Sequence, residues 1–380
     1  AVDADGNTDI QTGVYTTDRE NLSTDLYANL PFDFAGHTHN LIVGANWRDQ
    51  DQTNDSSRFA TNGLTQNVFE PDHAIPEPPL PYTMQDDVKT TQFGGYSQVR
   101  LRVLDPLTLV AGGRISWWES RNRNFTLNTS SDYAVDGQLT PFFAVIYDVL
   151  EQVSLYASYA DIFQPQNALQ SNGTLINPRT GSQYETGVKA EFLNQRVIAQ
   201  FALFRLQDQD RAITDPTDIR FFVSSGKVRS QGFEAEVTGM LLPGWNLSAG
   251  YTHVDTQYRV GTVTQEGQSF APFTPRHSAN LWTRYQIANG ALQGLSFGGG
   301  LRAVSSFYSE VTGANPARFV ADAYTLLSMQ LGYELNSHWS ANLTVNNLLD
   351  EKYYEKVSSS FRQNFYGEPR SFTLALRAKF

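Results

Sequence analysis

Apolar and polar positions alternate along most of the chain, and the alternation is clearest in the final segment, RSFTLALRAKF. Phe372, Leu374 and Leu376 share one side of this segment, whereas Arg377 and Lys379 share the other, because successive side chains of a strand face opposite sides of a sheet. One face suits lipid and the other suits a wet lumen, as in the closing strand of a transmembrane β-barrel. For this segment alone, an amphipathic edge strand of a soluble sandwich is the alternative.

The same period of two predicts hairpins along the whole chain, with tight turns and long polar stretches in alternation. Tight turns are predicted at Phe34–His37, Asp105–Pro106, Val149–Glu151, Leu193–Gln195, Leu242–Gly244, Ala288–Gly290 and Leu335–Ser337. The largest long stretch is Asp49–Thr90, which contains PEPPLP and must be loop because proline cannot donate to a strand ladder. Short turns on one side and long loops on the other are the layout of an outer-membrane barrel.

The hairpins also give a strand count. Seven hairpins and the terminal strand make about fifteen strands, at the roughly ten residues that a barrel strand needs. The first strand is expected near Leu22–Phe32 and leads to a tight turn, as does the last. Because single-chain bacterial barrels have an even strand number, we expect further strands before residue 1. The fold class is therefore all-β: an antiparallel transmembrane β-barrel, present in part.

Alternation assigns faces to the charged residues as well. An Arg or Lys on the lipid face at mid-bilayer costs about 2–4 kcal/mol, so the strand charges should point inward. The residues concerned are Arg100, Arg102, Arg114, Lys189, Glu191, Glu234, Glu236, Arg302 and Glu334. Such an interior is either a water-filled pore or the wall against which a folded plug docks.

Composition narrows the possible functions. No run of about eighteen apolar residues could form a membrane-spanning helix, while 24 Phe, 18 Tyr and 6 Trp are sufficient for aromatic girdles at both interfaces. The net charge of -11 argues against nucleic acid as a partner. Cysteine is absent and the six His are scattered, so no protein metal site is expected. No GxSxG, Walker loop or His/Asp/Ser array suggests an enzyme.

Several motifs carry a specific resemblance. They are YASYADIFQPQ (156–166), YETGVKAEF (184–192), GFEAEVTGMLLPGWNLSAGYTHVDT (232–256), TPRHSANLWTRY (274–285), NNLLDEKYYE (346–355) and YGEPRSFTLALRAKF (366–380). In this order and spacing the chain resembles the carboxy-terminal barrel of TonB-dependent siderophore receptors, and is most similar to those for ferric pyoverdine, coprogen and related hydroxamates.

The resemblance implies a barrel of about 22 strands around an amino-terminal plug, with a TonB box ahead of the plug. Residues 1–380 would then be the carboxy-terminal portion of the barrel domain, without the plug and roughly the first seven strands. The expected location is the outer membrane of a Gram-negative bacterium, in contact with the lipid bilayer. The expected partners are a ferric siderophore of hydroxamate or mixed type and, through the amino-terminal region, the TonB complex.

No cofactor is expected, since iron would arrive already ligated by the siderophore. The alternative from another class is a passive porin, which the charged lumen would also suit.

Candidate ligand-binding residues follow from faces and loops. Trp118 continues the lumen set of Arg114 and Ser116, so it could stack on ligand or pack on plug or loop, whereas Trp117 continues the lipid set and suits a girdle. Arginines expected in outer loops could pair with acidic groups of a siderophore or be solvated. They are Arg121, Arg123, Arg211 and Arg220. Tyr156, two residues after Ser154 on the lumen set, and Phe163 in DIFQPQ complete the candidate set.

Overall fold

The computed structural model describes residues 3–10, 12–57, 64–72, 74–75, 79–166, 168–172, 174–215, 218, 221–263, 265–311, 317–357 and 364–379. Strands dominate these residues. In this described part of the chain there is no helix long and apolar enough to cross a membrane.

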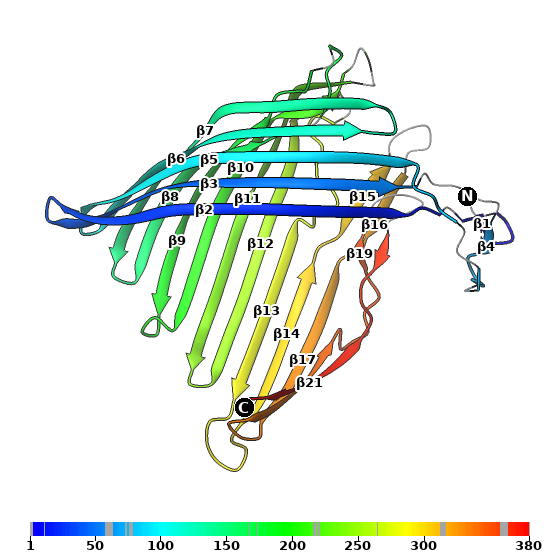
Figure 1. Ribbon diagram of the computed structural model, residues 1–380. Coiled ribbons are helices and arrows are strands. Elements are labelled where there is room, and N and C mark those ends of the chain that lie inside the picture. Colours follow the sequence, from blue (N-terminus) through cyan, green and yellow to red (C-terminus); the bar gives the residue numbers. More distant parts are fainter. Residues whose placement is uncertain are drawn as a thin grey trace. The chain divides into compact units, whose positions relative to one another are not determined.

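Fifteen strands form one sheet in which each strand is hydrogen-bonded to the next long strand of the chain (Figure 1). Their bounds are β2 Tyr15–Phe34, β3 His37–Ser56, β5 Met84–Leu104, β6 Leu107–Asn124, β7 Thr129–Leu150, β8 Val153–Gln164, β9 Arg179–Phe192, β10 Val197–Thr214, β11 Phe222–Leu242, β12 Trp245–Val260, β13 His277–Gln286, β14 Leu295–Val304, β17 Tyr324–Glu334, β18 Trp339–Asn346 and β21 Ser371–Ala378. This up-and-down order is the one that the alternation predicts.

Six short strands form three separate antiparallel pairings. They are β1 Asn7–Asp9 with β4 Thr65–Asn67, β15 Phe307–Val311 with β16 Ala317–Ala321, and β19 Tyr354–Lys356 with β20 Phe365–Tyr366. The second and third pairings are hairpins that each lie within one long connection, whereas β1 precedes the sheet and pairs with β4 in the connection from β3 to β5. These connections therefore contain structure of their own.

All seven predicted tight turns fall between consecutive strands of the sheet. In Figure 1 the turns that join β9 to β10 and β11 to β12 lie at the same edge. In the first turn Ala35 and Gly36 have φ of 52° and 82°, the left-handed pair that a two-residue turn of type I′ requires. The alternation of short turns and long connections is confirmed.

The chain divides into two compact units. The first comprises Ala1–Phe32, Asn40–Val99 and Gly112–Thr140, and the second comprises Asp33–His39, Arg100–Ala111 and Pro141–Phe380. Each is described by itself below.

In the first unit, polar side chains join neighbouring strands. Thr17 Oγ1 donates to Asn54 Oδ1 at 3.0 Å, and Thr53 Oγ1 donates to Asp87 Oδ1 at 2.9 Å. The second bond lies within Asp49–Thr90, which was predicted to be loop. That prediction is wrong at both ends, because β3 continues to Ser56 and β5 begins at Met84. The described prolines of PEPPLP lie outside any strand.

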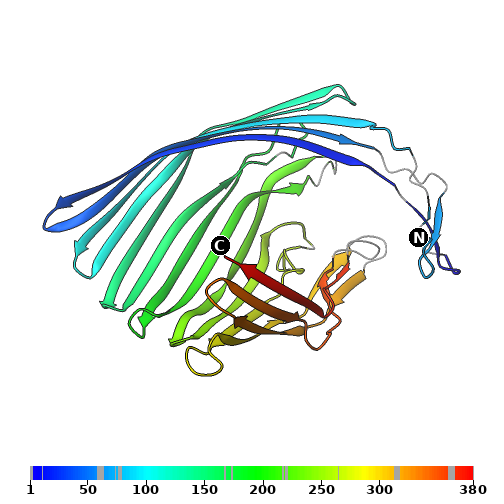
Figure 2. The ribbon, with the colours of Figure 1, turned by 60° about the horizontal axis from the view of Figure 1, so that its bottom comes forward.

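In the second unit, the two faces of the sheet differ as predicted. Lys189, Gln200 and Glu236 lie opposite one another on β9, β10 and β11 and form one polar row. On the other face the rings of Phe201 and Phe233 are 5.9 Å apart. The charges therefore share the lumen side and the aromatic rings share the lipid side. Figure 2 shows the carboxyl end of this unit, where β21 lies beside β18.

Candidate functional site

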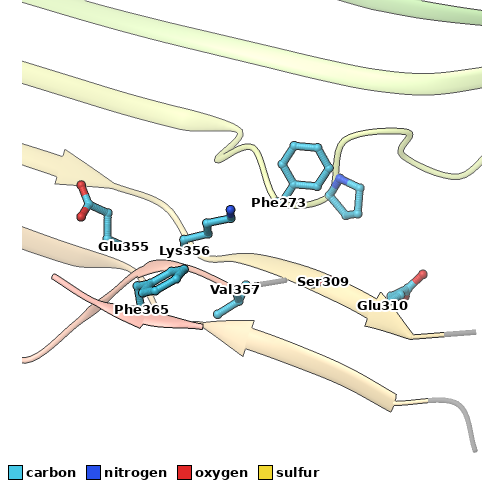
Figure 3. Close-up of a pocket in the computed structure, with 8 residues that line it drawn as sticks. Phe273, Ser309, Glu310, Glu355, Lys356, Val357 and Phe365 are labelled. Atoms are coloured by element: carbon cyan, nitrogen blue, oxygen red, sulfur yellow. The ribbon is translucent and has the colours of Figure 1, made fainter. Parts of the chain in front are cut away.

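A cavity of about 860 Å³ lies in the second unit, on the side of the sheet opposite the tight turns. Three connections line it, namely those from β12 to β13, from β14 to β17 and from β18 to β21. The lining residues are Pro272, Phe273, Ser309, Glu310, Glu355, Lys356, Val357 and Phe365. Figure 3 shows the Lys356 side chain rising towards Phe273, with Phe365 on the strand below.

The two hairpins at the cavity are closed by their own side chains. Across β15 and β16, Arg318 Nε donates to Glu310 Oε1 at 2.9 Å, and the Arg318 guanidinium lies 4.3 Å from the Tyr308 ring centroid. Across β19 and β20, the rings of Tyr354 and Tyr366 stack with centroids 4.4 Å apart. Each hairpin thus holds its lining residues in place.

An apolar cluster fixes both hairpins to the sheet. Val304, Phe307, Ala321, Tyr324 and Val357 are buried together. Figure 2 shows the two hairpins close to each other at this point. The Tyr353 ring packs on the Tyr324 ring at 4.3 Å. Burial raises the pKa of Tyr353 above its ordinary value, and the Glu355 carboxylate raises it further, so this phenol stays neutral at physiological pH.

The lining of the cavity combines aromatic faces with one ammonium group. Lys356 Nζ is 5.9 Å from the Phe365 ring centroid, within the range of a cation–π interaction. Glu310 and Glu355 supply carboxylates at its sides. Aromatic faces with a few polar groups are the usual lining for an organic ligand.

A second cluster lies where β9 and β10 approach the outer connections. Arg179 Nε forms an ion pair with Asp208 Oδ2 at 3.2 Å, and Arg211 Nη1 donates to the same oxygen at 2.8 Å. The other oxygen, Asp208 Oδ1, is buried and has no hydrogen-bond partner among the described residues. The Arg211 guanidinium also lies 5.5 Å from the ring centroid of Phe270, which precedes the cavity residues of its connection by two positions. Two guanidiniums on one carboxylate leave surplus positive charge and spare donors for an anionic group.

Nearer the tight turns, Tyr156 lies against the lumen wall. Its hydroxyl donates to Glu185 Oε1 at 2.7 Å, and Lys189 Nζ is 5.8 Å from its ring centroid. A Cβ added to Gly187 would meet the Tyr156 ring at 2.8 Å, so the ring lies flat over this glycine. Tyr156 is thereby part of the packed wall.

Comparison with known proteins identifies the family. Residues 2–348 match the family model described as "TonB dependent receptor-like, beta-barrel". The chain belongs to this family. Members of the TonB-dependent receptor family are outer-membrane proteins of Gram-negative bacteria, so the outward face of this sheet is the lipid face.

Similar receptors come from Pseudomonas. The ferric-pyoverdine M114 receptor of Pseudomonas sp. (strain M114) is 35% identical over 98% of this chain and 47% of the relative. The ferripyoverdine receptor of Pseudomonas aeruginosa is 31% identical over 96% of this chain and 45% of the relative. The structure of the pyoverdine outer membrane receptor FpvA from Pseudomonas aeruginosa PAO1, bound to pyoverdine, matches with a TM-score of 0.88 and 29% identity, over 100% of this chain and 55% of that one. The chain therefore spans about half the length of the curated relatives that it matches.

The predicted binding residues of the first unit lie on β6 of this receptor barrel. Trp118 packs edge-on against Tyr133, with ring centroids 5.2 Å apart. Arg121 forms an ion pair of 3.0 Å with Asp132, and the Arg123 guanidinium lies 4.8 Å from the Phe125 ring centroid. These arginines were expected in an outer loop, but β6 extends to Asn124. The strand is longer than predicted because polar residues continue its pairing.

The remaining candidates lie in the second unit or outside the described residues. Arg211 was also expected in a loop and instead lies on β10, where Asp208 holds it. Tyr156 is on the lumen face as expected, whereas Phe163 lies opposite Thr180 and shares the outward set of Leu155. Arg220 lies outside the described residues.

Sequence reasoning did not identify the cavity or the Arg179–Asp208 pair. Arg179 and Asp208 lie near the outer ends of the neighbouring strands β9 and β10, at lumen positions. Knowledge of the exact register between these strands would have been enough to predict that the two side chains are neighbours. The position of Phe365 at the cavity depends on how three separate connections meet.

Proposed function

We propose that this chain is part of the barrel of a receptor that binds a ferric siderophore at its outer connections and imports it with energy from the TonB complex. The observation that carries the proposal is membership of the TonB-dependent receptor family, together with a cavity on the side of the long connections that is lined by aromatic faces, one ammonium group and two carboxylates. Relatives with 35% and 31% identity are named as ferric-pyoverdine receptors.

The proposed ligand is a siderophore of hydroxamate or mixed type. Its flat organic part would lie against aromatic faces such as Phe273 and Phe365, and its acidic groups would pair with guanidiniums such as Arg211 and Arg179. The residues predicted from the sequence stay in the proposed binding set. They are Trp118, Arg121, Arg123, Tyr156, Phe163, Arg211 and Arg220. Phe163 would reach ligand only from the outward face of β8. The iron is cargo within the ligand.

The test is uptake of iron-labelled ferric siderophores by iron-starved cells that have or lack the complete gene. The panel contains ferric pyoverdines, ferric hydroxamates and ferric catecholates. We expect loss of uptake for one hydroxamate or mixed ligand when the gene is deleted, and its return when the gene is supplied. Unchanged uptake across the panel would contradict receptor function, and loss of catecholate uptake alone would contradict the ligand class.

A further inference from the structure

On β10, β11 and β12 the outward face of the sheet changes from aromatic to cationic within one residue row. One row consists of Leu203, Phe233 and His253. The next row, which is farther from the tight turns, consists of Arg205, Gln231 and Asp255. The row after it consists of Gln207, Arg229 and Gln257. Lys227 and Arg259 lie beyond them, at a bulge in β12. We call Arg205, Lys227, Arg229 and Arg259 the outer cationic patch. Figure 1 shows these three strands side by side.

The aromatic row beneath the patch is continuous. The Phe233 ring lies 5.9 Å from Phe201, 5.6 Å from Tyr251 and 5.5 Å from His253. Phe201 and Leu203 are exposed on this face. Aromatic rings of this kind mark the level at which the apolar interior of a bilayer ends and its headgroups begin. The patch therefore lies at headgroup level.

Neutral amides accept hydrogen bonds from these guanidiniums. Arg229 Nη2 and Arg259 Nη1 both donate to Gln257 Oε1, at 3.1 and 3.0 Å. The Gln207 amide oxygen accepts from Arg205 Nη2 at 2.7 Å. Arg229 Nε is buried and has no partner among the described residues.

The carboxylates near the patch already have partners. Asp255 forms an ion pair of 3.3 Å with Arg276. Asp161 accepts a hydrogen bond from Tyr159, and Asp210 accepts one from Thr180 at 2.8 Å. The patch thus keeps most of its positive charge, although the whole chain carries a net charge of -11.

We propose that the outer cationic patch binds the phosphate-bearing headgroup of a lipid in the outer leaflet, whose acyl chains lie along Phe201 and Phe233. Guanidinium groups match phosphate oxygens in a bidentate geometry, and basic clusters at headgroup level attract anionic lipids. The positive charge of the patch suits a phosphate group, and the aromatic rings beneath it suit acyl chains. Together they favour an amphiphile over a free anion. This site lies on the lipid face and is separate from the cavity proposed for the siderophore.

The experiment measures binding of phosphatidic acid, and of diacylglycerol with the same acyl chains, to the intact protein in neutral detergent micelles. The wild type should bind phosphatidic acid more tightly than diacylglycerol. The triple variant R205Q/R229Q/R259Q removes three cations, and should weaken phosphatidic acid binding by roughly a hundredfold at low salt. The charge-retaining variant R205K/R229K/R259K should keep most of the affinity.

The matched control removes three cations elsewhere, in R196Q/K352Q/K379Q, and should leave binding of both lipids unchanged. Heat-dependent gel mobility reports that each variant is folded. Equal affinity of the wild type for the two lipids would overturn the proposal, as would full phosphatidic acid affinity in the folded triple glutamine variant. Binding of inorganic phosphate as tight as that of phosphatidic acid would also overturn it, since the site would then recognise a free anion.

Discussion

Single residues in this barrel are constrained most tightly where a large side chain covers a glycine on the lumen wall. Gly187 illustrates this, because its missing side chain leaves the space that the Tyr156 ring occupies and lets Lys189 lie over the other part of that ring. The sequence places Tyr156 on the lumen face by alternation, but it cannot show that the ring packs on the wall. That contact depends on the register between β8 and β9.

We expect Gly187→Ala to lower the free energy of unfolding by about 1–3 kcal/mol, the usual effect of overpacking. The added methyl group would meet the Tyr156 ring at 2.8 Å and also the Phe201 carbonyl oxygen. The matched control is Gly95→Ala, because a Cβ at Gly95 meets nothing within 4 Å. Urea unfolding in detergent, followed by tryptophan fluorescence, measures both. Equal stability of the two variants would contradict the packing argument.

Trp118 and Trp117 are adjacent on β6 and face opposite sides. If Trp118 stacks on ligand, Trp118→Ala should weaken siderophore binding by about 1–3 kcal/mol, the effect of losing a hot-spot aromatic. Trp117 packs on Phe93 at 5.5 Å, so Trp117→Ala should leave binding unchanged. Quenching of tryptophan fluorescence by the ferric siderophore identified in the uptake panel gives the dissociation constants. An unchanged constant for Trp118→Ala would mean that its contact with Tyr133 is its whole role.

At the scale of elements, the period of two predicted the tight turns better than it predicted the strand ends at the long connections. All seven tight turns were located because apolar alternation continues to the turn on that side of the bilayer. On the other side, strands continue as polar ribbons that lack an apolar face. Thr17, Asn54 and Asp87 belong to such ribbons, and their side chains bond across strands without any hydrophobic pattern. For the same reason Arg121, Arg123 and Arg211 were expected in loops.

The connection from β18 to β21 depends on one buried amide. Asn347 Nδ2 donates to the carbonyl oxygens of Glu351 and Glu368, at 2.9 and 3.1 Å, and Asn347 Oδ1 accepts from the Glu351 amide at 2.8 Å. Asn347→Ala would leave these backbone groups unpaired, at a cost of about 1–3 kcal/mol for each buried group. We expect faster proteolytic cleavage between residues 348 and 370, and weaker siderophore binding because β19 and β20 line the cavity.

The control for Asn347→Ala is Asn336→Ala. Asn336 caps the tight turn between β17 and β18 through bonds to the His338 and Trp339 amides. This variant should leave cleavage of the outer connection unchanged. Mass spectrometry of the fragments after limited proteolysis locates the cuts, and the same cleavage rate at residues 348–370 in both variants would contradict the assigned role.

At the scale of the whole molecule, a charged lumen wall suits both a plugged receptor and a diffusion channel. The named relatives are siderophore receptors, so the porin alternative is not retained. If the charges on β9 to β11 dock a plug, as the family resemblance implies, the intact protein should conduct little current in a planar lipid bilayer. A diffusion porin of similar strand number should conduct strongly. Sustained open-channel conductance of the intact receptor would contradict the plugged arrangement.

The hairpins β15–β16 and β19–β20 have a consequence for how such receptors diverge. Each is a two-stranded sheet of its own, closed by local contacts such as Arg318–Glu310 or Tyr354–Tyr366. Each joins the wall at one shared apolar cluster. A lineage can therefore replace the sequence of one hairpin without altering the register of any barrel strand. Ligand preference can therefore change in small steps without a change in the barrel strands.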